Sequence, residues 1–579
     1  MRLLFYVEPL FELDRPSLKL NWASEIALLI AEVLRAVEET LEVHLVVNDA
    51  IARQLRPPEN VRVCTIPHGV LRDAFGVNDS VEILKAWLLG RYSQQQRLAY
   101  GETIRARIGS FEPEVIVSWT PVPFLQALYP RAKVLHTEFA LFSHVPFPKS
   151  YFFDPIGPGG TAFLNRFWRE IDGSLSVNNA DLAEIREFKA YCRRSLGDTS
   201  PFRSEIEVAR KRFRKLLLCP LQFQGHFLIE TYSRFRSQFE LLLYVLDHVP
   251  KDVGVIVTGH PLGTVLPSEA IEYVQQSCPN ALFLSGGEGL RTPSQYILPD
   301  VDGVVTATSK IGFHTLLFDK KLIDGGLGFF RFMADGESVR DIAVTLETAC
   351  RNKDKLLWWL ATHFAVPRTQ LTNGEWLARF LHRCQRHEPG PTFYEAFGSS
   401  KQVIGSLRLA LDREIRWEWS RQALDKFIAL ANRGEYTGAL NSPGHGIADL
   451  FAKRVLAGKA TLSEFVTDYP ENLYSALYCR GIVMLNHEAR FSEARLYFRN
   501  LFRLLMAATE EHSSQSEAFR ITAWYSKLCE GLACRYAGLN DEAGAIREAI
   551  LQAGDAPAAL RPPADVTKRG TTELAIEEG

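Results

Sequence analysis

The chain lacks the cysteine patterns of a disulfide framework or a zinc site. Its nine cysteines are odd in number, widely scattered and without a C-x-x-C pair. Disulfide-rich domains and structural zinc sites both need cysteines at close, regular spacings. The pattern therefore argues against both and favours a reducing compartment.

Long apolar runs and an excess of one charge are also missing. No run approaches the roughly 18–20 apolar residues that a membrane helix needs. The short apolar start at residues 1–7 is followed at once by Glu8 and Glu12, unlike a signal peptide. With 66 basic and 68 acidic residues the net charge is −2, which argues against bulk nucleic-acid binding. We expect a cytoplasmic protein whose membrane contact, at most peripheral, would be at the inner face.

Short apolar runs that resemble strands alternate with helical patterns through the first two thirds of the chain. The runs lie at 3–7, 43–47, 61–66, 115–119 and 133–135, and again at 216–222, 254–257 and 303–305. This alternation is typical of parallel sheets with crossover helices. Because 579 residues are too many for one core, we predict two Rossmann-like α/β domains, at 1–180 and 181–385. The stretch 146–160 is dense in proline and glycine and predicts a packed loop without regular structure.

Beyond a proline-containing linker the sequence carries helical patterns and no strand signals. In two segments, 476–494 and 528–543, a glycine is followed after about a dozen residues by an alanine. This spacing is typical of the close helix contacts in tetratricopeptide-like hairpins. We predict an all-α, tetratricopeptide-like domain at 395–555. It would bind a protein partner, make a homo-oligomer or simply stabilise the second domain. The composition of 556–579 predicts a disordered tail.

Polar and glycine-rich residues follow three strand runs of the second predicted domain. Because ligands of parallel sheets bind beyond the carboxyl ends of the strands, these loops should meet at one site. Hydroxyls, a histidine and the amides of a helix start suit a phosphorylated ligand. We therefore predict a nucleotide-sugar site. Its candidate residues are Gln222, Gln224, His260, Pro261, Thr308, Ser309, Lys310, Gly312 and His314.

The motifs in both predicted domains resemble those of bacterial capsule polysaccharide biosynthesis proteins. The shared segments are Leu135-His136-Thr137-Glu138-Phe139, Pro146-x-Pro148, Phe153-Asp154-Pro155-x-Gly157, Leu221-Gln222, Gly259-His260-Pro261 and Thr308 to His314. The resemblance covers roughly residues 1–385. It implies the GT-B fold, in which two Rossmann-like domains face a cleft, and CMP-Kdo as the donor. By resemblance, His260 and Pro261 would hold the CMP moiety.

Some candidate binding residues have a second interpretation. The imidazole of His260 can donate to a phosphate or ribose oxygen, or it can be an ordinary polar group after a strand. Thr308 and Ser309 precede a helical pattern, where they could cap the helix as well as bind phosphate. Lys310 could neutralise phosphate or be solvated. His314 stands where the resembled family has a glutamate that would grip the ribose, and a histidine can still hydrogen-bond sugar hydroxyls.

Three residues are candidates for the chemistry. Glu138 could remove the proton of the acceptor hydroxyl as the new bond forms, or be a surface glutamate beside a loop. Asp154 could contact substrate or anchor the Asp-Pro turn. His226 stands where retaining members of the resembled family carry an aspartate nucleophile. Either the alignment slips, with Asp154 or Glu230 compensating, or the mechanism differs, or activity is lost. Helix dipoles and side chains can neutralise a leaving phosphate, so we expect no obligatory metal or cofactor.

The leading hypothesis is a glycosyltransferase of bacterial surface-polysaccharide assembly. It would transfer Kdo or a related ulosonic acid from a CMP-sugar to a glycan or glycolipid acceptor. The alternatives are a GT-B transferase that uses a UDP- or GDP-sugar, a non-catalytic scaffold that binds partners through its helical region, and a two-domain epimerase. The fold alone does not separate these alternatives.

Overall fold

The chain forms two compact units, residues 1–414 and 415–579. The computed structural model describes residues 1–11, 16–119, 124–140, 147, 149–223, 225–260, 264–287, 290–460, 472–511 and 516–560. None of the helices in these ranges combines the length and the apolar character that a membrane span needs.

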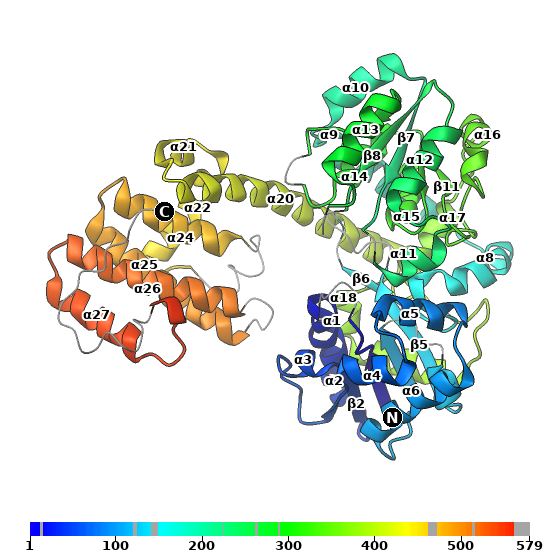
Figure 1. Cartoon of the computed structure of the whole chain (residues 1–579), viewed down its shortest axis with the longest axis horizontal. Helices are drawn as coiled ribbons and strands as arrows, with labels where there is room; N and C mark the ends of the chain where they lie inside the picture. Colours follow the sequence, from blue (N-terminus) through cyan, green and yellow to red (C-terminus); the bar gives the residue numbers. More distant parts are fainter. Residues whose placement is uncertain are drawn as a thin grey trace. The chain divides into compact units, whose positions relative to one another are not determined.

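The first unit begins with a seven-stranded sheet in the order β12-β6-β5-β4-β1-β2-β3 (Figure 1). Its strands are β1 (Arg2–Val7), β2 (Glu42–Val47), β3 (Val61–Thr65), β4 (Val115–Trp119), β5 (Lys133–Phe139), β6 (Ser150–Asp154) and β12 (Val366–Pro367). Strands β1 to β5 are parallel, with Phe5 of the central strand beside Leu45 and Val117. All of β1 after Arg2 is buried, as expected for a strand that helices cover on both faces.

Helices connect the strands of this sheet and continue toward the second sheet. They are α1 (Pro16–Trp22), α2 (Leu28–Arg35), α3 (Asp49–Ala52), α4 (His68–Phe75), α5 (Ser80–Leu89), α6 (Gln94–Ile108), α7 (Leu125–Leu128), α8 (Ala162–Ser174) and α9 (Asn179–Asp198).

The prediction that 146–160 has no regular structure is wrong for its middle. Ser150–Asp154 forms β6, which pairs antiparallel with β5 and with β12. The aromatic residues Tyr151, Phe152 and Phe153 are each 1% exposed, and such residues favour a strand because they pack well on a pleated surface. The prolines and glycines lie outside this run. β12 falls within the range predicted for the second domain, 181–385, yet it pairs with β6 and so extends the first sheet.

The second sheet has five strands, all parallel, in the order β11-β10-β7-β8-β9 (Figure 1, green). They are β7 (Lys215–Pro220), β8 (Val253–Thr258), β9 (Ala281–Leu282), β10 (Gly303–Thr306) and β11 (Lys321–Asp324). The helices between α9 and β12 are α10 (Arg203–Arg212), α11 (Phe227–Tyr232), α12 (Gln238–His248), α13 (Ser268–Ser277), α14 (Pro293–Ile297), α15 (Ile311–Phe318), α16 (Ile342–Glu347) and α17 (Asp354–Trp359). Two later helices, α18 (Arg368–Leu371) and α19 (Gly374–Arg386), follow β12 and pack against α2 of the first half. The predicted pair of parallel α/β sheets is confirmed.

The described part of residues 415–579 is helical throughout, as predicted. Its helices are the end of α20 (Ser400–Asn432), α21 (Tyr436–Leu440), α22 (Pro443–Leu456), α24 (Leu473–Asn486), α25 (Phe491–Glu511), α26 (Ser516–Tyr536) and α27 (Asn540–Gln552). A Cβ at Gly481 would lie 2.5 Å from the Phe498 ring, and one at Gly531 would lie 3.3 Å from Ile546. Both predicted glycines thus allow close helix contacts. Ala556 is 4% exposed and Ala558–Leu560 forms a 3-10 helix, so the start of the predicted tail is ordered; residues 561–579 lie outside the described part.

Two glycines of α22 allow a matched test of this helical packing. A Cβ at Gly444 would lie 2.0 Å from the backbone oxygen of Ala423, whereas one at Gly446 would meet nothing within 4 Å. Gly444→Ala is therefore expected to lower the free energy of unfolding of this unit by about 3 kcal/mol. Gly446→Ala should raise it by about 0.5–1 kcal/mol, because alanine favours a helix more than glycine does. Amide hydrogen exchange of α22 in the full chain measures both effects, and equal exchange in the two variants would contradict this packing.

Candidate functional site

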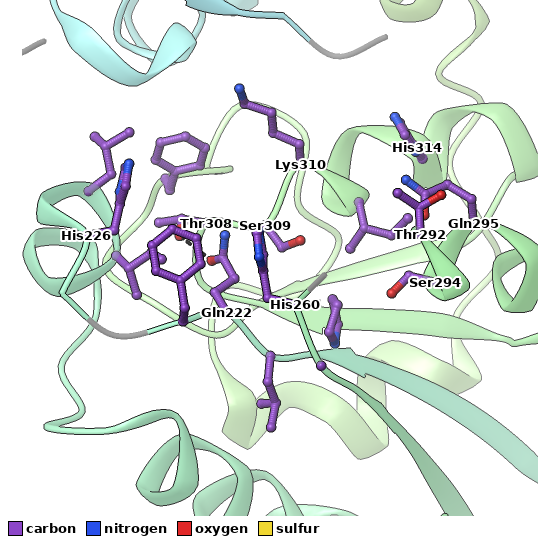
Figure 2. A pocket seen from close by; sticks show the side chains of 18 of the residues that line it. Gln222, His226, His260, Thr292, Ser294, Gln295, Thr308, Ser309, Lys310 and His314 are labelled. Carbon is purple, nitrogen blue, oxygen red and sulfur yellow. Dashed lines mark hydrogen bonds between the residues drawn. The ribbon is translucent and has the colours of Figure 1, made fainter. Parts of the chain in front are cut away.

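A pocket of about 160 Å³ lies at the carboxyl ends of the second sheet's strands (Figure 2). The loop after β7 contributes Gln222 and His226, and His260 follows β8. Thr308, Ser309 and Lys310 follow β10, and His314 is on α15. The first half contributes Glu138 from β5. The structure thus brings together three predicted loops and a carboxylate from the other sheet.

Thr308 and Gln222 connect two of these loops. The Thr308 hydroxyl donates to Gln222 Oε1 at 2.6 Å, and the Gln222 backbone N–H donates to Gln238 Oε1 at 3.0 Å. The N-cap of α15 is Lys310, and its side chain makes no capping hydrogen bond. The alternative in which Thr308 or Ser309 caps this helix is therefore wrong. Their side chains instead line the pocket.

An ion pair crosses from one half of the unit to the other beside the pocket. Lys310 Nζ lies 2.9 Å from Glu138 Oε1, and the two side chains are 17% and 23% exposed. The same ammonium group lies 5.6 Å from the centre of the Phe139 ring. Glu138 is therefore neither a freely solvated surface residue nor a buried one, and Lys310 is held toward the first sheet.

The histidines of the pocket contact aromatic rings. The His260 ring lies edge-on to Phe223, with centroids 4.6 Å apart, and His226 stacks on Phe227 at 4.9 Å. His314 is fully buried and lies edge-on to Phe147 at 4.8 Å. Figure 2 shows His260 beside Gln222 and Ser309, with His226 on one side of the pocket and His314 on the other. The rings therefore have limited freedom to turn.

Glu230 is occupied in holding the loop after β7. Its Oε1 accepts from the Gly225 N–H at 3.0 Å, and its Oε2 lies 3.1 Å from Lys85 Nζ of α5. It does not line the pocket. The geometry gives no support to the interpretation in which Glu230 replaces the missing carboxylate at His226.

Asp154 lies outside the pocket lining and anchors the turn after β6. Its carboxylate accepts from the backbone N–H groups of Ile156 at 2.8 Å, Gly157 at 3.1 Å and Phe163 at 3.0 Å. Burial raises its pKa to about 6, and the three N–H groups oppose this rise. These contacts match the turn-anchoring interpretation of the Asp-Pro sequence.

Asp154→Ala is expected to lower the free energy of unfolding by about 3 kcal/mol, because three backbone N–H groups would lose their acceptor. Urea denaturation of the full chain, followed by tryptophan fluorescence, measures this change. Asp172→Ala on the exposed face of α8 is the matched control and should leave the transition unchanged. A stable Asp154→Ala protein that fails to bind donor would instead favour a substrate contact.

Gly312 is not among the residues that line the pocket. A Cβ at this position would lie 2.7 Å from the Phe330 ring, so the residue is needed for close packing of α15. Two other predicted binding residues, Gln224 and Pro261, lie outside the described residues, as do Pro146 and Pro148 of the predicted proline-rich loop.

The sequence did not single out one edge of the pocket. Thr292, Ser294 and Gln295 lie at the start of α14, and the hydroxyls of Ser294 and Thr258 are 2.7 Å apart. The available signal was a hydroxyl residue before Pro293, which is typical of a helix start.

The sequence also contains a D-x-D pattern at 300–302. This pattern precedes β10 and so lies at the amino end of that strand, where Asp302 pairs with Arg210 at 2.6 Å.

The comparisons with known proteins address the same region. Residues 183–350 match the family model of the capsule polysaccharide biosynthesis protein. This match confirms the resemblance predicted from the motifs, over the segment that contains the loops after β7, β8 and β10. No curated protein matches the chain.

Several solved structures are similar to this chain at low identity. KpsC from Thermosulfurimonas dismutans, a beta Kdo 2,7 transferase, has 16% identity and a TM-score of 0.31, over 52% of this chain and 96% of KpsC. A UDP-N-acetylglucosamine 2-epimerase assigned in Listeria monocytogenes has 12% identity and a TM-score of 0.27, over 67% of this chain and 96% of the epimerase. The UDP-GlcNAc 2-epimerase from Neisseria meningitidis has 12% identity and a TM-score of 0.23, over 71% of this chain and 100% of its own. At these values the likenesses carry no argument about activity.

Proposed function

We propose that the chain is a GT-B glycosyltransferase of bacterial surface-polysaccharide assembly. Its donor would be CMP-linked Kdo or a related ulosonic acid, and its acceptor a glycan or glycolipid. One observation carries the proposal: a carboxylate of the first sheet and the polar loops of the second line a single pocket. The family match over residues 183–350 supports the setting in capsule polysaccharide biosynthesis.

The reaction would give separate roles to the carboxylate of the first sheet and to the loop after β10. An acceptor hydroxyl oxygen would bond to the anomeric carbon while the bond from that carbon to the phosphate oxygen breaks. The electron pair of the broken bond leaves with CMP, and the hydroxyl proton passes to the Glu138 carboxylate. Lys310 and the hydroxyls of Thr308 and Ser309 would stabilise the charge that develops on the phosphate. These net changes are the same for a single or a double displacement.

The pocket must widen to admit such a donor. Pockets that bind small molecules usually measure about 300–1,000 Å³, whereas this one measures about 160 Å³. Near this pocket, the Lys310–Glu138 and Lys85–Glu230 ion pairs join the half that contains the first sheet to the half that contains the second. We propose that donor binding moves these halves apart.

Calorimetric titration of the full chain with CMP, UDP and GDP tests the donor class. The proposal predicts binding of CMP and at least tenfold weaker binding of UDP and GDP, because the pocket would recognise cytidine as well as phosphate. Preferred binding of UDP or GDP would move the assignment to a transferase or an epimerase that uses those sugars. No nucleotide binding by correctly folded protein would remove the donor claim.

A second candidate function, a non-catalytic scaffold, is favoured by two histidines. His226 and His314 stand where the resembled family carries carboxylates, and both line the pocket. Product formation by the wild-type chain would exclude the scaffold. For residues 415–579 we propose a protein partner or a second copy of this chain as the ligand, and light scattering of the full chain tests the second copy.

A further inference from the structure

Lys310 is placed to contact two different anions. Its ammonium group pairs with Glu138 at 2.9 Å, and its own loop contains Thr308 and Ser309, which line the pocket beside His260. Figure 2 shows the Lys310 side chain rising from this loop, away from the strands. A phosphate at the loop would therefore lie within reach of the lysine that now holds the carboxylate.

The two anions would compete for this lysine. An ammonium group has three N–H donors but only one charge, and the pair is partly buried. For a pair near the surface, opposite unit charges about 4 Å apart attract by about 4 kcal/mol before desolvation is counted. A donor phosphate would offer an attraction of the same order. Within the described residues, the Lys310–Glu138 pair is the ion pair that joins the pocket lining of one half to that of the other.

We propose that Lys310 is a positioning residue. It holds the Glu138 carboxylate until the donor phosphate takes the place of that carboxylate on the Lys310 ammonium group. Donor binding then releases the Glu138 carboxylate toward the acceptor hydroxyl, so the base is available only once the donor is in place. Binding is consequently ordered, with donor before acceptor. The inference rests on the proposed function for the identity of the anion, and it adds the order of events and the role of the pair.

A double-mutant cycle on nucleotide binding tests the competition. CMP is titrated into the full-length wild type, Glu138→Gln, Lys310→Met and the double variant. Glu138→Gln should bind CMP about three- to fivefold more tightly, since an ion pair of this exposure no longer has to be broken. Lys310→Met should bind about tenfold more weakly. The double variant should match Lys310→Met, because without the lysine the carboxylate has nothing to compete for.

Two controls separate competition from a general effect of charge or folding. Glu347→Gln removes a carboxylate that pairs with Arg214 away from the pocket, and CMP affinity should not change. Lys310→Arg keeps the positive charge and should retain most of the CMP affinity that Lys310→Met loses. Equal tightening by Glu138→Gln with and without Lys310 would overturn the inference, because that result is the effect of net charge alone. Unchanged affinity in Glu138→Gln would overturn it as well.

Inorganic pyrophosphate separates this inference from the donor assignment. It carries phosphate charge without cytidine, so its binding should show the same dependence on Glu138. Pyrophosphate binding that tightens in Glu138→Gln, with no CMP binding, would support the competition and remove the cytidine donor. Pyrophosphate that fails to bind, or that binds wild type and Glu138→Gln equally, would overturn the competition whatever the donor is.

Discussion

Glu138→Gln is expected to lower kcat for glycosyl transfer by about 10²–10⁴-fold, the usual contribution of a general base. The amide keeps the size of the side chain but cannot take the acceptor's proton. Because the substitution also frees Lys310, donor affinity should not fall. A fall in kcat without a loss of donor binding is the signature that separates a base from a merely structural glutamate. Steady-state kinetics with CMP-Kdo and an acceptor glycan measure both quantities.

The matched control for this substitution is Glu102→Gln. Glu102 lies on α6 and is exposed, so kcat and donor affinity should match the wild type. Transfer at the wild-type rate in a folded Glu138→Gln protein would contradict the assignment of the base.

His260→Ala is expected to weaken CMP binding by about 10–100-fold, which corresponds to one hydrogen bond to a charged group. His260 follows β8 and meets the Phe223 ring edge-on, so its imidazole is oriented before ligand arrives. Because its aromatic neighbour restrains it, little entropy is lost when it binds phosphate or ribose. Calorimetry measures the change.

His387→Ala is the control for His260→Ala, because His387 is exposed after the end of α19. Its CMP affinity should equal that of the wild type. His260→Gln keeps a hydrogen-bond donor and should recover part of the affinity. Equal CMP binding by wild type and His260→Ala would show that the histidine is an ordinary polar residue after a strand.

The sequence predicted the sheets because their strands are continuous apolar runs. Buried parallel strands such as β7 and β8 show this pattern over most of their length, with Lys215 at the start of β7 and Thr258 at the end of β8. The three loops could be placed at one edge because parallel strands all end there. β6 was missed because its aromatic run lies within a stretch rich in prolines and glycines. The preference of those residues for loops hides the preference of the aromatic run for a strand.

The details of the site depend on contacts that no local pattern records. Lys310 and Glu138 are 172 positions apart, and their pairing follows only from how the two sheets are packed. Gly312 belongs to a recognisable motif. A glycine is needed there because the Phe330 ring, which lies outside the motif, leaves no room for a side chain. Asp154 was expected to be either a substrate contact or a turn anchor, and only the three backbone N–H groups around it show which interpretation the fold favours.

The most direct measurement for the central claim is a donor screen of the full chain across CMP-, UDP- and GDP-sugars, with release of the nucleotide as the readout. We expect release of CMP from CMP-Kdo, and we expect Glu138→Gln to abolish the release that accompanies transfer to an acceptor. Release only from UDP- or GDP-sugars, or from none of the donors by folded protein, would contradict it.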